Sequence, residues 1–592
     1  MTTSFNPAPA PFARAETMHG LFEWCAVRWP DRTALHHRGR DTTYRELAET
    51  ADAYAAELQA RGVERGSLVP VLLPRSPELF ATLLAVLKCG AAYAALDLRW
   101  PSSRLAGLIE HLGGPVVAAE RGARWPSVWS PPEQPIPGAR PAAVDVGADD
   151  ACAVFFTSGT TGTPKGVVTA HRGNVRLFDD WLFTPLDSGA VMPQALAATW
   201  DAFGLDSWGV LFNGGTLVLL EDTLELATKL RDLVAIHGVT TIFPPTAVFH
   251  SMVDNDLDAF AGLRAVGTGG ERLSARHAAR FLEAYPDIPL YNMYGPVESS
   301  VAATCHRVRP EDCTAPGSVP LGVPFPNTQA YILDGDRLCE AGESGEIALG
   351  GKGLALGYFE DAELTARKFG SISLPSGPER VYRTGDLGRW SADGLLHFEG
   401  RADRQVKIRG HRIELDDVEQ NAGRVPGVGA CAVVPVTGAD GAYEDLCLFY
   451  AGSGDTAPGE DELRARLAER LPGYLVPALV RRMERLPVLE DRKLDRRALT
   501  ELAARLRTAA GPVAESPLSD TEAAVARILR EIIGVPSIAA DVSFFRQGGN
   551  SLSAAQLCSR ISRDLGVKLR ISQVFEAPTV RGVAGLITAG KP

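Results

Sequence analysis

The sequence predicts a multidomain α/β protein, with a large N-terminal core, a small α+β domain after it and an all-α helical bundle at the C-terminal end. Helical patterns alternate with short apolar runs from about residue 15 to 400, which is typical of α/β layers. Near residue 400 the pattern becomes more compact, and from residue 518 onward it is wholly helical. With 592 residues and 45% hydrophobic content, the chain is too long for one core and too apolar for disorder.

Individual elements follow from these patterns. The N-terminal part has a helical pattern at 44–62 and strand-like apolar runs at 68–73, 216–220 and 330–333. The middle part has strand-like runs at 431–436 and 446–450 and a helical pattern at 460–471. Residues 507–517, rich in Ala, Gly and Pro, predict a linker. The expected domains are 1–402, 403–506 and 518–592, with the linker at 507–517.

Composition excludes several classes of protein. The formal net charge of -12 and the pI near 5.5 argue against a nucleic-acid partner. We interpret the local basic run at 481–485 as a solvated helix face. The nine cysteines are scattered and contain no C-x-x-C pair, so neither a disulfide framework nor a zinc site is indicated. The first residues show no basic region followed by an apolar stretch, and no run is long enough to span a bilayer, so we expect a cytoplasmic protein with no leader and no membrane partner.

A glycine-rich segment at 155–166 reads FFTSGTTGTPKG. Its small residues allow backbone amides to approach phosphates, its hydroxyls can hydrogen-bond them, and Lys165 adds a positive charge. It is not a Walker A loop, because Pro164 precedes Lys165 and Gly166 follows it. A Ser/Thr/Gly run alone is usually a turn, but this composition suits a nucleoside triphosphate.

A second motif, GGNSL, places Ser551 after a glycine pair. Ser551 is predicted to begin a helix, where its hydroxyl is exposed and the helix N-terminus favours an incoming phosphate. The alternative is an ordinary N-cap serine. The helix should bury one face and end at Gly566; the residues of that face are Ala554, Cys558, Ile561 and Leu565.

Further motifs follow in a fixed order along the chain. They are Thr43-Tyr44-Arg45-Glu46-Leu47, Leu87-Lys88-Cys89-Gly90-Ala91-Ala92-Tyr93, Asn292-Met293-Tyr294-Gly295-Pro296-Val297-Glu298, Tyr382-Arg383-Thr384-Gly385-Asp386-Leu387, Gly400-Arg401-Ala402-Asp403 and Leu471-Pro472-Gly473-Tyr474. With the two motifs above, this series resembles the adenylation–peptidyl carrier (thiolation) didomain of nonribosomal peptide synthetases, within the adenylate-forming superfamily. The resemblance implies a large adenylating core, a small mobile subdomain and a carrier bundle.

By this resemblance the chain binds ATP. Tyr294 would stack on adenine, Asn292 would bond its amino group, and Asp386 would accept from both ribose hydroxyls. The other nucleotide-binding positions implied are Thr157, Ser158, Gly159, Thr160, Thr161, Gly162, Gly295 and Arg401.

Three catalytic residues are implied: Lys165, Glu298 and Lys493. Glu298 would ligate Mg²⁺, because a hard cation prefers carboxylate oxygen. Lys493 would neutralise charge where the substrate carboxylate attacks the α-phosphorus. Its flanks depart from the family, reading Asp491-Arg492 where Asn-Gly is usual.

Two other positions bear on the reaction. Val297 replaces the usual threonine, whose hydroxyl contacts phosphate, and Val297→Thr is expected to raise the adenylation rate. Asp403 matches the hinge about which the small subdomain turns.

The resemblance also implies a substrate pocket. Asp201 would pair with the α-ammonium of an amino acid, since a carboxylate facing an apolar pocket needs a cation. The other positions are apolar or glycine: Ala202, Leu205, Ile242, Gly267, Gly269, Met293, Val301 and Ala302. Because the two glycines leave space, we expect a medium to large hydrophobic side chain, aromatic or branched aliphatic.

These expectations define the reaction and its partners. The chain would form an aminoacyl-AMP from a hydrophobic L-amino acid and load it onto 4'-phosphopantetheine at Ser551. A phosphopantetheinyl transferase, a downstream tailoring enzyme or condensation domain, and an MbtH-like helper are the partners considered. The alternatives are an acyl or aryl acid:CoA ligase, which Asp201 and the carrier argue against, and a degenerate fold kept as a scaffold. The string at 36–41 echoes a condensation-domain motif but lacks its glycine, so we interpret it as a strand and turn.

Overall fold

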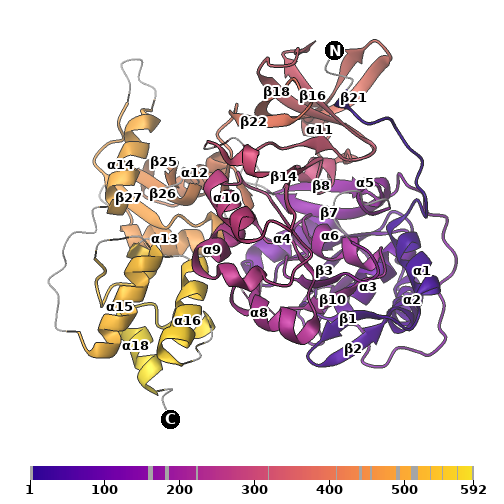
Figure 1. The fold of residues 1–592 in the computed structure, drawn as a ribbon, viewed down its shortest axis with the longest axis horizontal. Coiled ribbons are helices and arrows are strands. Elements are labelled where there is room, and N and C mark those ends of the chain that lie inside the picture. Colours follow the sequence, from indigo (N-terminus) through magenta and orange to yellow (C-terminus); the bar gives the residue numbers. More distant parts are fainter. Residues whose placement is uncertain are drawn as a thin grey trace. The chain divides into compact units, whose positions relative to one another are not determined.

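The computed structural model describes residues 5–589, with gaps at 158–163, 180–185, 222–224, 316, 318, 409, 439–442, 454–456, 489–493, 509–517, 534, 536, 548, 550, 568 and 570. The chain forms two compact units. One is built mainly from residues up to Gln405 and the other mainly from Val406 onward (Figure 1).

A seven-stranded sheet in the first unit carries the glycine-rich segment. Its strand order is β19-β8-β7-β4-β3-β5-β6. The strands are β3 (Leu68–Leu72), β4 (Ala92–Ala95), β5 (Val117–Ala119), β6 (Val128–Trp129), β7 (Ala151–Thr157), β8 (Lys165–Ala170) and β19 (Gly357–Tyr358). Strands β3, β4 and β5 pair in parallel, and such pairs need crossover connections, which here are α3 (Pro77–Lys88) and α4 (Ser102–Leu112). Strands β7 and β8 form an antiparallel hairpin.

A four-stranded sheet, in the order β2-β1-β10-β9, lies in the same unit. Its strands are β1 (Thr33–His37), β2 (Arg40–Thr43), β9 (Val191–Gln194) and β10 (Thr216–Leu219). The β1–β2 hairpin confirms the strand and turn expected at 36–41. Helix α2 (Tyr44–Ala60) follows directly, and a capping box between Thr43 and Glu46 fixes its start.

The five-stranded sheet supplies most of the candidate site. Its order is β11-β12-β13-β14-β15. The strands are β11 (Thr241–Ile242), β12 (Ala265–Gly269), β13 (Leu290–Tyr294), β14 (Thr304–Val308) and β15 (Val323–Pro324). Other helices of this region are α1 (Met18–Arg28), α5 (His171–Phe178), α6 (Phe203–Asp206), α7 (Trp208–Leu211), α8 (Glu225–His237), α9 (Thr246–Asn255) and α10 (Ala275–Ala284), with short 3₁₀ turns η2 (Leu257–Phe260), η3 (Val297–Ser299) and η4 (Pro310–Cys313).

An antiparallel sheet completes the first unit. Its order is β17-β16-β18-β21-β20, with β22 on β21. The elements are β16 (Thr328–Asp334), β17 (Arg337–Leu338), β18 (Gly345–Gly351), β20 (Phe369–Leu374), β21 (Gly377–Trp390), β22 (Leu396–Arg401) and helix α11 (Ala362–Lys368). Strands β16, β18 and β21 lie side by side in Figure 1.

The second unit contains two short sheets and the C-terminal helices. A hairpin pairs β23 with β24, and a three-stranded sheet has the order β25-β26-β27. The elements are β23 (Val406–Ile408), β24 (His411–Ile413), α12 (Leu415–Gly423), β25 (Val428–Thr437), β26 (Tyr443–Gly452), α13 (Glu460–Ala468), η5 (Gly473–Leu475), β27 (Leu479–Met483) and α14 (Arg496–Thr508). The basic run at 481–485 was expected on a helix, and this is wrong: Arg481 and Arg482 lie in β27, which pairs in parallel with β26.

The C-terminal helices are α15 (Asp520–Ile533), η6 (Phe544–Gln547), α16 (Ser551–Leu565), α17 (Ile571–Glu576) and α18 (Val580–Ala589). They share one apolar core that includes Ala554, Cys558 and Ile561, with Leu565 partly buried against it. Gly566 ends α16 with a φ of 71° and donates to the Ser562 carbonyl at 3.1 Å. The predicted buried face and C-cap are therefore confirmed, as is the α/β core with a C-terminal helical bundle.

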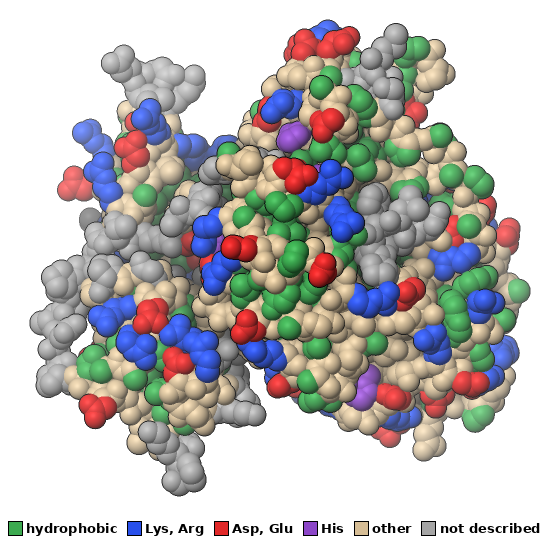
Figure 2. Space-filling view, viewed as in Figure 1, with side chains coloured by type: hydrophobic (Ala, Val, Ile, Leu, Met, Phe, Trp, Pro, Cys, Tyr) green, Lys and Arg blue, Asp and Glu red, His purple; other side chains and the backbone are tan. Residues whose placement is uncertain are grey.

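On the face shown in Figure 2, basic and acidic side chains are interspersed. Among the described residues, none of the helices combines the length and apolar character needed to cross a bilayer.

Candidate functional site

The glycine-rich loop is held between β7 and β8. Thr157 and Lys165 are register partners at the loop end of this hairpin, and both are half-buried. The next residue is Gly166, at which a Cβ atom would lie 3.1 Å from both Phe359 Cβ and Val154 Cγ1. Residues 158–163 lie outside the described part of the chain, so the predictions for Ser158, Gly159, Thr160, Thr161 and Gly162 stay predictions. The two residues that flank the loop are brought opposite each other.

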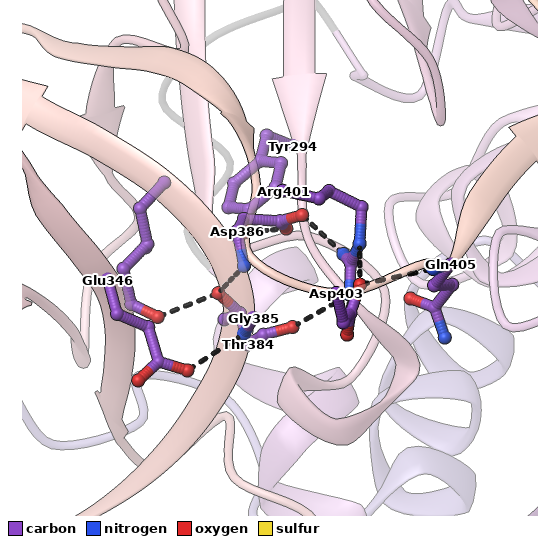
Figure 3. Close-up of polar contacts among 9 residues, drawn as sticks. Tyr294, Glu346, Thr384, Gly385, Asp386, Arg401, Asp403 and Gln405 are labelled. Carbon is purple, nitrogen blue, oxygen red and sulfur yellow. Dashed lines mark hydrogen bonds and ion pairs between the residues drawn. The ribbon is translucent and has the colours of Figure 1, made fainter. Parts of the chain in front are cut away.

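Three of the residues expected to bind the nucleotide meet where β13 and β22 end beside the interior of β21. Tyr294 closes β13, and Asp386 of β21 is the register partner of Arg401 of β22. The Tyr294 hydroxyl donates to Asp386 Oδ2 at 2.6 Å, and Arg401 Nη1 donates to Asp386 Oδ1 (Figure 3). Burial, followed by the nearby Asp386 carboxylate, raises the pKa of Tyr294 well above its usual value, so the hydroxyl remains a donor. Each carboxylate oxygen has a second lone pair for a further donor such as a ribose hydroxyl.

The backbone around Asp386 is also fixed. Thr384 Oγ1 donates to the Ile347 carbonyl at 2.7 Å and accepts from the Asp386 amide at 3.0 Å. The Gly385 amide donates to Glu346 Oε1 at 2.9 Å (Figure 3). The Asp386 side chain is therefore presented on a rigid backbone.

Asn292 lies two residues before Tyr294 on β13 and is 4% exposed. Its Nδ2 donates to the Pro320 carbonyl at 2.8 Å. This bond fixes the orientation of the side-chain amide. Its Oδ1 is a hydrogen-bond acceptor, which is the type of atom that a purine amino group requires.

Glu298 is a buried carboxylate in η3, with 2% exposure. The Tyr358 hydroxyl donates to Glu298 Oε1 at 2.7 Å, and the Ala355 amide donates to the Glu298 carbonyl at 2.9 Å. Neighbouring Val297 is 7% exposed and belongs to the main apolar core. The benefit expected from Val297→Thr stays a prediction.

The expected pocket residues converge on α6 and on the five-stranded sheet. Asp201 and Ala202 form the turn before α6, and Asp201 Oδ1 accepts from the Ala202 amide at 2.9 Å. A Cβ atom at Gly204 would lie 3.4 Å from Val301 Cγ2, so α6 lies close to this valine. The main apolar core, the cluster to which Val297 belongs, also contains four of the expected residues, namely Leu205, Met293, Val301 and Ala302. Ile242 is fully buried in β11 but is not a member of this cluster.

The two pocket glycines do not leave space, and that expectation is wrong. A Cβ atom at Gly267 would lie 2.1 Å from the ring of Phe243 and 3.2 Å from Met293 Cε. A Cβ atom at Gly269 would lie 2.5 Å from the Met293 carbonyl oxygen. The glycines instead allow the Phe243 ring and strand β13 to approach β12 closely.

Lys493 lies outside the described residues, and only the flanks of its segment can be placed. Val488 and Leu494 form an antiparallel bridge, and the Asp495 amide donates to the Pro487 carbonyl at 2.9 Å. The role of Lys493 stays a prediction.

Asp403 precedes the division between the two units by a few residues. Its carboxylate accepts from Arg401 Nε and Nη2, each at 2.7 Å, and from the Gln405 amide at 3.2 Å (Figure 3). Burial alone would raise the pKa of Asp403, but the bonds from Arg401 and Gln405 outweigh it and lower the pKa below its usual value.

Ser551 is the first residue of α16, as predicted. The Gly549 amide donates to the Phe544 carbonyl at 2.8 Å, and a Cβ atom at Gly549 would lie 2.2 Å from the Phe544 ring. The glycine before the serine is therefore required by the close approach of a core aromatic residue.

Two protein-family models match parts of this chain. A family model described as AMP-binding enzyme matches residues 22–359. The chain belongs to this family. A second model, described as phosphopantetheine attachment site, matches residues 523–587, which include Ser551.

Solved structures narrow the family. The fold superposes on holo-PA1221, described as an NRPS protein containing adenylation and PCP domains bound to a vinylsulfonamide inhibitor, with a TM-score of 0.83 and 29% identity over 100% of this chain and 98% of that one. A second PA1221 structure gives a TM-score of 0.73 and 30% identity, with 82% of this chain and 97% of that one covered. The chain is an adenylation–carrier didomain of the nonribosomal peptide synthetase type.

Curated relatives are much longer than this didomain. Tyrocidine synthase 3 of Brevibacillus parabrevis is 36% identical over 598 residues, covering 99% of this chain and 9% of the relative. Surfactin synthase subunit 1 of Bacillus subtilis (strain 168) is 35% identical, covering 99% of this chain and 16% of the relative. The chain thus spans less than a fifth of the length of either relative.

The didomain is an adenylate-forming enzyme that uses ATP and Mg²⁺ and carries covalent phosphopantetheine. The residues present fit these groups. Glu298 offers a buried hard oxygen ligand held by Tyr358, and Ser551 stands at the N-terminus of a 15-residue helix.

Sequence reasoning missed three residues that contact candidate site residues or their loop: Tyr358 bonds Glu298, the Phe243 ring fills the space beside Gly267, and Arg176 bonds the Ser299 carbonyl. For Tyr358 and Phe243 the sequence carries no local signal, because each contacts a residue that is distant in the chain.

Proposed function

We propose that the didomain activates an α-amino acid with an apolar side chain and tethers it to its own carrier serine, Ser551. The observation that carries the proposal is Asp201, a half-buried carboxylate in the turn before α6, the helix that contributes Phe203 and Leu205 to the main apolar core. A carboxylate in such surroundings is stabilised by a cationic ligand group, and the α-ammonium of an amino acid supplies one.

In the first step the substrate carboxylate oxygen attacks the α-phosphorus of ATP, and the bond to pyrophosphate breaks. Tyr294, Asn292 and Asp386 would hold the adenosine, while Thr157, Lys165 and the intervening loop would hold the phosphates. Glu298 would hold Mg²⁺, which offsets the negative charge of the phosphates. Lys493 would complete the neutralisation from the small subdomain.

In the second step the acyl group leaves AMP and becomes tethered to the carrier. Phosphopantetheine on Ser551 supplies the thiol that accepts it. Asp403 is proposed as the hinge about which the small subdomain turns between the two steps. The proposed domains stay those expected from the sequence, 1–402, 403–506 and 518–592, with the linker at 507–517. A phosphopantetheinyl transferase must load Ser551, and a condensation domain or tailoring enzyme would consume the product. Any need for an MbtH-like helper, and the cytoplasmic location, stay predictions.

The substrate class is tested with matched acids. ATP–pyrophosphate exchange is measured with apolar amino acids, their des-amino analogues and a set of aryl acids. We expect exchange only with amino acids, and Asp201→Asn should raise the amino-acid KM by at least about tenfold, the loss of one charge-assisted bond. Faster exchange with an aryl or des-amino acid, or efficient transfer to free CoA, would instead favour the acid:CoA ligase alternative.

A further inference from the structure

Arg176 of α5 is an arginine buried in the first unit, with 2% exposure. Its Nη2 donates to three backbone carbonyls, those of Ser299 at 2.6 Å, Ser300 at 3.3 Å and Ala302 at 2.7 Å. Among the residues that the structure describes, no carboxylate pairs with it. Burying a guanidinium costs free energy, which its hydrogen bonds must offset. The three carbonyls that accept these bonds therefore identify the segment on which Arg176 acts.

The segment held by Arg176 is strained. Ser300 has a φ of 47° and Val301 a φ of 73°. The left-handed region is unfavourable for a β-branched residue, and such a conformation persists only where the surrounding structure holds it. The carbonyls bonded to Arg176 belong to Ser300 itself and to the residues on either side of the strained pair.

Two glycines make room for this contact. A Cβ atom at Gly353 would lie 2.4 Å from Arg176 Nε, and one at Gly173 would lie 2.2 Å from Ser300 Oγ. The glycines come from different parts of the chain, one after β18 and one in α5. The close approach of the guanidinium and the loop therefore depends on backbone that carries no side chain.

The loop connects two functional elements. Glu298, the proposed magnesium ligand, immediately precedes Ser299, and Val301 and Ala302 are proposed walls of the substrate pocket. We propose that Arg176 is a positioning residue that fixes the 299–302 loop, and thereby sets both the metal-binding carboxylate and the side-chain selectivity. The inference rests on the proposed function and adds a residue to it.

The test compares Arg176→Met with a matched control. Arg14 also holds backbone carbonyls of the first unit, those of Asp179 at 3.1 Å, Phe212 at 2.6 Å and Phe178, but does not contact the 299–302 loop. Both variants lose a carbonyl-binding arginine. ATP–pyrophosphate exchange of the full chain is measured against Mg²⁺ concentration and against a pair of apolar amino acids differing by one methylene.

For Arg176→Met we expect the Mg²⁺ concentration for half-maximal exchange to rise at least about tenfold, the effect of losing one charge-assisted bond. The preference between the two amino acids should fall severalfold. Arg176→Lys should recover part of both effects, and Gly353→Ala, which displaces the guanidinium, should reproduce them. Arg14→Met should lower the melting temperature without changing either quantity. Equal Mg²⁺ requirements and equal selectivity in Arg176→Met and Arg14→Met would overturn the inference.

A second measurement separates this inference from the proposed function. If the wild-type chain shows no exchange with any amino acid, the proposed function fails, but the effect of Mg²⁺ on ATP affinity can still be measured by calorimetry. The inference predicts that Mg²⁺ strengthens ATP binding less in Arg176→Lys and Gly353→Ala than in the wild-type chain. An unchanged effect of Mg²⁺ in both variants would refute it.

Discussion

The hydroxyl of Tyr294 donates a 2.6 Å hydrogen bond to Oδ2 of Asp386, and both side chains are more than nine-tenths buried. Arg401 binds the other oxygen of the same carboxylate and also both oxygens of Asp403. The residue proposed to bind ribose and the residue proposed as the hinge therefore share one arginine (Figure 3).

Removing the Tyr294 hydroxyl should weaken ATP binding. Tyr294→Phe keeps the ring that would stack on adenine but removes a donor to a buried carboxylate, a bond of roughly 1.5 to 3 kcal/mol. We expect the KM for ATP in the exchange assay to rise about tenfold or more, with a smaller change in kcat. A KM equal to that of the wild-type chain would show that Arg401 alone suffices to hold Asp386.

Asp403→Pro should separate the two half-reactions. Fixing the backbone at this position should block turning of the small subdomain, so adenylation should persist while transfer to the carrier falls below detection. Since the substitution also removes the ion pair with Arg401, Asp403→Ala is the matched control. The control should lose little transfer. Equal loss of adenylation and transfer in the proline variant would contradict the hinge assignment.

Phe243 should limit the size of the substrate side chain. Its ring fills the volume beside Gly267, so Phe243→Ala opens space in the apolar cluster that contains Met293 and Val301. The relative rate of exchange should shift toward amino acids with larger side chains, by about tenfold for one or two added methylene groups. Gly267→Ala, in which a Cβ atom meets the ring, should instead reduce exchange with every substrate. An unchanged order of substrates in Phe243→Ala would place this ring outside the pocket.

Stability should fall on acidification because of a buried histidine. His171 is fully buried and accepts from the Met18 amide at 3.1 Å; burial, followed by the proximity of His19, lowers its pKa to about 3. Between pH 6.5 and about 3 the unfolded chain binds a proton at this position that the folded chain does not, so the free energy of unfolding decreases as pH falls, by up to about 1.4 kcal/mol per pH unit.

The check is calorimetry at pH 7, 6 and 5 on the wild-type chain and on His171→Gln, whose carbonyl can still accept from Met18. The melting temperature should fall less steeply with pH in the variant. Parallel curves would show that His171 does not titrate as its burial implies.

Local signals predicted much of the fold. The helical pattern at 44–62 predicts α2, and the spacing of Ala554, Cys558 and Ile561 predicts the buried face of α16, because both signals depend on neighbours along the chain. The basic run that includes Arg481 and Arg482 led to a wrong prediction of a helix. These residues lie in a short strand, which also leaves some of its side chains toward solvent, as an exposed helix face does.

The site was less predictable where it depends on tertiary contacts. Gly267, considered alone, suggests an open space in the pocket. In the structure that space is filled by the ring of Phe243, which directly follows β11. Arg176 carries no motif, and its role follows only from the three carbonyls that the fold brings to its guanidinium.

The most direct test of the central claim is intact-protein mass spectrometry of the phosphopantetheinylated chain after incubation with ATP, Mg²⁺ and a mixture of proteinogenic amino acids. We predict the addition of one apolar amino-acid residue mass, lost in Ser551→Ala and strongly reduced in Asp201→Asn. A chain that carries phosphopantetheine but gains no amino-acid mass, or gains a polar one, would contradict the account.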